Sequence, residues 1–234
     1  MNAFTRFFHI ILWQPLFNLL VVFYLLTGNL GIAIIILTLL VRIVLYPMQN
    51  KASKSQMAMQ SLQSQVKEIQ NKYKDNKEEQ TKQILALYKE KEINPFSGFL
   101  TLFIQIPVFI VLYNIFRSGI TEKTLQFLYS FVPAPEQVNT IFLGMDLSEP
   151  NKLLAVIVAI LFFLQVKLSA PKQDKSKKKG MGDMIQKQMN YFFPVLIGFA
   201  IAISPAALGL YLAIGTLFLI IQQHFVKKRM QENV

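Results

Sequence analysis

Few residues in this chain have the types and the spacing that enzyme chemistry requires. The chain has no Cys and only two His, His9 and His224, which excludes thiolate chemistry and argues against a transition-metal site. Ser204 has no His or Asp close in sequence to serve as its base. The apolar stretches also lack the paired carboxylates that acid–base catalysis uses. We therefore expect a protein that is not an enzyme and that uses no metal or cofactor.

Arg42 is the most informative residue, because it lies inside an apolar run. Counted from Met48 along a helix, it lies roughly 9 Å from the end of that run. A charge at this depth in a membrane costs a few kcal/mol and is tolerated where it meets water or polar groups. No carboxylate of the apolar runs is available as its partner. Either the Arg42 side chain extends to the lipid headgroups, or the helices enclose a wet cavity.

Other polar residues favour the cavity. Thr38 precedes Arg42 by one helical turn and shares its face. Further amides fall in or near those halves of the apolar runs that adjoin the basic loops: Gln105, Gln165, Gln188, Asn190, Gln222 and Gln223. Taken singly, each amide is explained at least as well by hydrogen bonding between helices. Only their clustering predicts a hydrophilic groove.

The composition requires a membrane as solvent. Hydrophobic residues make up 53% of the 234 residues, charged residues only 16%, and the mean hydropathy is +0.40. Stretches of roughly 20 residues with few charges are typical of spanning helices. We predict five, at 29–48, 95–117, 150–169, 186–204 and 206–226. The uncharged core of the third span, between Lys152 and Lys167, is short. It requires either a locally thin bilayer or lysine side chains that extend to the headgroups. Ser204-Pro205 separates the last two.

The opening segment, residues 1–28, is apolar but interrupted by polar residues. Gln14 and Asn18 share one helical face, which favours an amphipathic helix lying in the membrane interface. A spanning helix is an alternative. A cleaved signal peptide is less favoured, because no small-residue cleavage site follows Leu26.

The basic residues predict the orientation. The loops at 49–94 and 170–185, with their flanks, and the tail at 227–234 hold 19 of the 24 Lys and Arg, whereas the opposite side holds four. The positive-inside rule places the loops and the C-terminus in the cytoplasm and the 118–149 loop outside. Within 49–94, apolar or small residues spaced by three and four predict two helices around a break at 74–77. Their apolar stripe either holds this helical hairpin together or binds a partner.

The loop at 170–185 carries a run of lysines, Lys172, Lys175, Lys177, Lys178 and Lys179. It is either a solvated positive-inside loop or a contact for anionic lipid or ribosomal RNA phosphate. The short tail supports the same two interpretations.

Three stretches together resemble one family. They are IIILTLLVRIVLYPM, then LALYKEKEINPFSGFLTLFIQIPVFIVLYNIF after the Lys-rich hairpin, and then MNYFFPVLIGFAIAISPAALGLYLAIGTLFLIIQQHFV. They look like the YidC membrane-protein insertase family of the YidC/Oxa/Alb group, in its bacterial form without the large periplasmic domain. The resemblance covers about residues 13–226.

The resemblance implies an all-α integral membrane protein of the bacterial cytoplasmic (inner) membrane. Five transmembrane helices enclose a hydrophilic groove open to cytoplasm and bilayer, with an N-terminal interface helix and a mobile cytoplasmic hairpin. By this resemblance Arg42 lines the groove, and Thr38 and Tyr211 contact substrate. The implied partners are nascent membrane proteins, the ribosome and the Sec translocon. The short tail weakens the case for ribosome docking, and Leu212 stands where many relatives carry a second aromatic residue.

These observations predict an insertase and chaperone for membrane proteins. The alternative is a small-solute transporter or channel. It is disfavoured because the predicted spans contain no Asp or Glu for ion coupling and show no inverted repeat.

Overall fold

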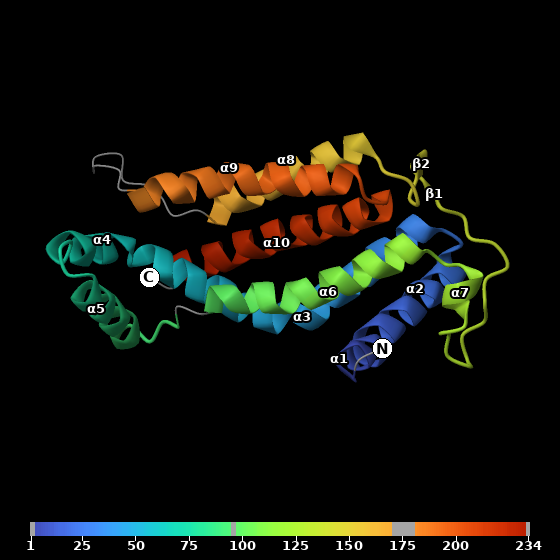
Figure 1. Ribbon diagram of the computed structural model, residues 1–234, viewed down its shortest axis with the longest axis horizontal. Coiled ribbons are helices and arrows are strands. Elements are labelled where there is room, and N and C mark those ends of the chain that lie inside the picture. The colour runs from blue at the N-terminus through green and yellow to red at the C-terminus, as the bar shows by residue number, and fades with distance from the viewer. Residues whose placement is uncertain (1–2, 95–96, 170–180, 233–234) are drawn as a thin grey trace.

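Long helices run side by side along the longest axis of the molecule (Figure 1). The structure, a computed structural model, describes residues 3–94, 97–169 and 181–232. The elements in chain order are α1 (Ala3–Phe8), the π-helical turn η1 (His9–Trp13), α2 (Gln14–Thr27), α3 (Leu30–Ser61), α4 (Gln63–Lys72), α5 (Lys77–Glu90), α6 (Ser97–Ser118), α7 (Glu122–Leu125), β1 (Ile141–Phe142), β2 (Met145–Asp146), α8 (Lys152–Ser169), α9 (Met181–Ala202) and α10 (Ala206–Glu232).

Helix α10 lies in the middle of the bundle. It packs against α8 on one side and against α3 and α6 on the other, while α9 packs mainly on α8 and α2 packs on α3. The helices α4 and α5 lie at one end, called here the hairpin end, together with the C-terminus. The helix α7 and the strands lie at the other, called here the loop end (Figure 1).

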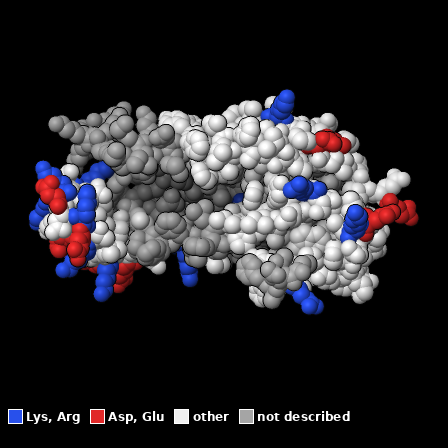
Figure 2. Space-filling view, in the orientation of Figure 1, with Lys and Arg blue, Asp and Glu red and all other residues white. Residues whose placement is uncertain are grey.

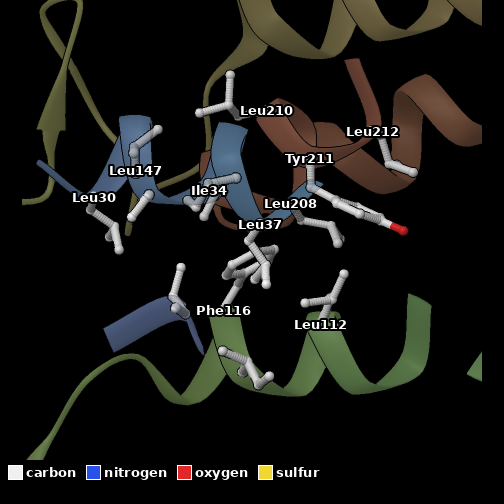
Figure 3. Close-up of a cluster of buried hydrophobic side chains, with 14 of the residues drawn as sticks. Leu30, Ile34, Leu37, Leu112, Phe116, Leu147, Leu208, Leu210, Tyr211 and Leu212 are labelled. Carbon is white, nitrogen blue, oxygen red and sulfur yellow. The ribbon is translucent and has the colours of Figure 1, made fainter. Parts of the chain in front are cut away.

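Apolar side chains fill the bundle interior and also cover much of its outside. Leu37, Leu112 and Leu208 come from three different helices and meet in the buried cluster drawn in Figure 3. Large apolar residues on the outer faces, such as Val44 and Phe199, are exposed. A surface this apolar requires lipid rather than water around it.

Three helices among the described residues are long and apolar enough to cross a membrane: Arg6–Thr27, Leu30–Met59 and Ala206–Val226. The predicted spans at 95–117, 150–169 and 186–204 coincide with α6, α8 and α9, which are helical but fall outside this set. The count of five therefore stays a prediction. The opening segment meets the criterion of length and composition, so its placement in the interface also stays a prediction beside the spanning alternative.

Helix α3 extends beyond the predicted end of the first span at residue 48. It continues through Pro47 to Ser61, so the span and the first part of the 49–94 region form one helix of 32 residues. The turn of the hairpin lies at Tyr73–Asn76 and overlaps the predicted polar break at 74–77, which is shifted by one residue. There the Asn76 side chain accepts a hydrogen bond from the backbone N–H of Glu79 and caps α5.

A two-stranded hairpin at the loop end departs from the purely helical prediction. Ile141 pairs with Asp146 and Phe142 with Met145, around a turn where Leu143 and Gly144 both have positive φ. The Phe142 ring occupies the space that a Cβ at Gly31 would need, so the turn packs on the start of α3. This close approach depends on the missing side chain of Gly31.

The polar face of the opening segment packs on the chain's own loop. Asn18 Nδ2 donates to the Phe127 carbonyl at 3.1 Å, and Asn18 Oδ1 accepts from the Tyr129 N–H at 2.7 Å. Gln14 Nε2 donates to the same Phe127 carbonyl at 3.0 Å. The shared face of Gln14 and Asn18 thus has a partner inside the protein, which the interface interpretation did not foresee.

We expect Asn18→Leu to lower the free energy of unfolding by about 1–3 kcal/mol, because it removes the buried amide of Asn18 and leaves the partly buried N–H of Tyr129 without this acceptor. Thermal unfolding of the detergent-solubilised protein measures the effect. Asn114→Leu is the matched control, because Asn114 is an exposed amide on α6. Equal melting temperatures for the two variants would contradict the structural role of Asn18.

Candidate functional site

A buried arginine is held by a chain of hydrogen bonds across three helices. Arg42 of α3 is 3% exposed, and its Nη1 donates to Oε1 of Gln105 on α6 at 3.1 Å. The Gln105 Nε2 in turn donates to the Tyr211 hydroxyl on α10 at 2.9 Å. The structure therefore brings together three of the predicted groove residues, called here the arginine cluster.

Tyr211 is positioned by packing. Its ring belongs to the buried apolar cluster, while its hydroxyl points away from Leu208 and toward the edge of that cluster (Figure 3). Burial of the ring with the polar tip directed at a partner is the usual way that tyrosine is accommodated inside a protein. The buried Tyr211 ring therefore places its hydroxyl where it accepts the hydrogen bond from Gln105.

Gly215 gives the guanidinium its space. A Cβ built at this position would lie 2.5 Å from Arg42 Nη2 and 2.9 Å from Nε. Gly215 follows Tyr211 by one helical turn on α10, so both residues face the same region. Gly215 was not among the residues predicted from the sequence, although a glycine inside a helical apolar run indicates close packing of a neighbour.

The charge of Arg42 has no acidic partner among the described residues. Its only described hydrogen-bond acceptor is an amide oxygen, and its buried Nε has no partner among the described residues. A buried cation normally requires a counter-charge or a full set of acceptors. The cluster therefore retains unused capacity to bind an anionic or hydrogen-bond-accepting group.

The other predicted groove residues separate by position. Thr38 lies one turn from Arg42 and is fully buried, but its hydroxyl donates to the Ile34 carbonyl of its own helix at 2.6 Å. Gln165 is half-buried on α8, and within the described residues no hydrogen bond joins it to Arg42. Gln188 and Asn190 belong to α9, but their side chains lie outside what the structure describes. Lys172, Lys175, Lys177, Lys178 and Lys179 also lie outside the described residues.

Gln222 lines a cavity of about 910 Å³ between α3, the end of α5 and α10, further toward the hairpin end than Arg42. Its side chain is 4% exposed, and neither its Nε2 nor its Oε1 has a described partner. Arg42 does not line this cavity. The predicted groove residues thus divide between the arginine cluster and a separate space near the hairpin end.

On the face shown in Figure 2, charged side chains gather most densely at the hairpin end, and others lie toward the loop end. The described residues hold no group of three or more His, Asp or Glu that could bind a metal ion. Chemically, the arginine cluster offers a cation, an amide and a hydroxyl, which are groups that can hydrogen-bond to polar or anionic groups.

The family model described as "60Kd inner membrane protein" matches residues 22–233. Among similar proteins, a membrane protein insertase YidC of Rickettsia akari (strain Hartford) is 30% identical over 227 residues, which cover 93% of this chain and 39% of that protein. Another of the same name, from Francisella tularensis subsp. novicida (strain U112), is 32% identical over 207 residues, which cover 88% of this chain and 34% of that protein.

One solved structure, titled "Active YidC insertase crystal structure with the first transmembrane domain resolved", superposes with a TM-score of 0.63 and 30% identity. The match covers 89% of this chain and 46% of that one. The chain spans less than two fifths of the length of the first curated relatives that it matches. The likeness therefore concerns the helical part that those proteins share with this chain.

Proposed function

Because the chain belongs to the 60Kd inner membrane protein family, the family of the YidC insertases, we propose that it inserts proteins into the bacterial inner membrane. The observation that carries the proposal is Arg42, a buried cation on a helix long enough to span, with no acidic partner among the described residues. A cation kept in this state inside a membrane protein is costly and is typical of a functional site.

In the proposed mechanism, a hydrophilic segment of the substrate enters from the hairpin end. Arg42 attracts its acidic side chains, and the Gln105 amide and the Tyr211 hydroxyl replace part of their hydration. The substrate's apolar helix then moves sideways into lipid, which favours each central Leu, Ile, Phe or Val by roughly 0.3–0.6 kcal/mol. No covalent step, nucleotide or cofactor is needed.

The finer topology is part of the same proposal. Five spanning helices, with the hairpin end and the C-terminus in the cytoplasm, fit the bias of Lys and Arg toward the loops of that end. Charged side chains of α4 and α5 gather there in Figure 2 as well. Nascent membrane proteins are the proposed substrates, with lipid as their destination and the Sec translocon or the ribosome as proposed partners.

Insertion into vesicles tests this function. A single-span substrate with an acidic N-terminal tail is added to vesicles that hold only the purified protein, and protease protection scores the insertion. We expect protection above that of empty vesicles. Equal protection with and without the protein would contradict the proposal, and flux of a small solute through the same vesicles would support the transporter alternative instead.

A further inference from the structure

The cavity near the hairpin end has the two-sided character of a phospholipid. One wall is apolar and comes mainly from α10, through Phe218, Ile221 and Phe225. The other wall is polar and basic, with Asn50 and Lys54 from α3 and with Lys91 after the end of α5. Its volume of about 910 Å³ lies within the roughly 300–1,000 Å³ range of ligand pockets.

The amides of this cavity lack partners. Gln222 is more than nine-tenths buried, yet its Nε2 and Oε1 both have no described hydrogen bond, and Asn50 Oδ1 is likewise buried and unpartnered. An amide in this state loses its hydration without compensation unless a ligand supplies the missing hydrogen bonds. This observation indicates that a polar group occupies the cavity.

The charges favour a phosphate as that group. Within the part of the chain that the structure describes, Lys54 makes no ion pair, and the one ion pair of Lys91 is with its exposed neighbour Glu90. Such a surface ion pair contributes little, so the Lys91 ammonium is available to an anion. Glu92 is the one acidic residue of the lining, and the two lysines outnumber it.

The cavity also opens onto the outer surface of the bundle. Ile221 and Phe225 line it and are nevertheless 56% and 58% exposed, so its apolar wall continues onto the outer surface of α10. The uncharged stretch of α10 ends at Val226, and the first basic residues of α3 beyond Arg42 are Lys51 and Lys54. Both helices thus leave the hydrocarbon layer at this level, where lipid headgroups lie.

We propose that this cavity binds one phospholipid, with the headgroup phosphate between Lys54, Lys91 and the Gln222 amide and the acyl chains along Ile221 and Phe225. The bound lipid covers the opening between the cavity and the surrounding bilayer. The proposal is independent of the insertase function, because lipid binding is measured without any substrate protein.

Native mass spectrometry of the full chain in detergent tests the site by titration with phosphatidylglycerol or phosphatidylethanolamine. The variant Lys54→Ala/Lys91→Ala should weaken the tightest lipid binding by about tenfold or more, because two charge-assisted contacts are removed. Lys51→Ala/Lys89→Ala is the matched control, since these lysines are exposed, lie two or three positions from Lys91 and Lys54 in the sequence, and do not line the cavity. It changes the net charge equally and should leave the affinity unchanged.

Gln222→Leu keeps the volume and the apolar character of the wall but removes the amide, and it should weaken binding as well. Diacylglycerol, which lacks the phosphate, should bind more weakly than either phospholipid. Equal loss in the control pair would overturn the proposal in favour of unspecific charge attraction. Displacement of the lipid by inorganic phosphate at the same concentration would overturn it in favour of a simple anion site.

Discussion

Replacement of Arg42 by alanine should reduce insertion of a substrate with an acidic tail by at least about tenfold. A carboxylate about 4 Å from a cation gains about 4 kcal/mol at an effective dielectric constant of about 20, and each 1.4 kcal/mol corresponds to tenfold in rate. Arg42→Lys loses the planar group that donates to Gln105. Because it keeps the positive charge, it should nevertheless retain much of the activity. Initial insertion rates in vesicles should fall in the order original protein, Arg42→Lys, Arg42→Ala.

We do not expect loss of folding to cause that result. Arg42 is buried, and its guanidinium has one described acceptor and an Nε without a described partner. Because a buried charge with incomplete pairing destabilises the folded state, its removal should not lower the free energy of unfolding. We therefore expect Arg42→Ala to unfold at a temperature equal to or above that of the original protein. A substrate whose translocated tail has no acidic residues is the internal control and should depend less on Arg42. Full activity of Arg42→Ala on the acidic tail would rule out the proposed role of the charge.

The sequence located the arginine cluster only in part. Arg42 was recognisable because a charge in an apolar run needs an explanation, and Gln105 because its amide lies in a second run. Tyr211 was expected from the family resemblance alone, because a tyrosine in an apolar helix looks like an ordinary core residue. Which amides meet Arg42 depends on the packing of α3 against α6 and α10, and one sequence contains no information on that register.

The loop end shows a second limit. The polar face of Gln14 and Asn18 was visible in the sequence, but polar residues on one face are compatible with headgroups, water or another segment of the chain. Their partners lie 109–113 residues away in the Phe127 region, a distance in sequence that periodicity cannot bridge. The hairpin of β1 and β2 was missed because its two-residue strands are too short for an alternating pattern.

Gly215→Ala should impair insertion, though less than Arg42→Ala does, because it displaces the charge without removing any functional group. The new methyl carbon would lie 2.5 Å from Arg42 Nη2, and because the guanidinium is the end of a flexible side chain, it moves while the backbone stays. That movement displaces the charge and breaks the 3.1 Å hydrogen bond to Gln105. Overpacking of this kind costs about 1–3 kcal/mol, whereas alanine in a helix gains roughly 0.5–1 kcal/mol over glycine. Stability should therefore change little while the insertion rate falls.

A double-mutant cycle separates displacement of Arg42 from any other consequence of the methyl group. With alanine at position 42 the guanidinium is absent, so the substitution at Gly215 has nothing to displace and should cause no further loss of insertion. Such strong non-additivity is expected only of residues in direct contact. If Gly215→Ala lowered the rate by the same factor in both backgrounds, the glycine would act through helix packing instead. Its effect in the original protein would then say nothing about the position of the charge.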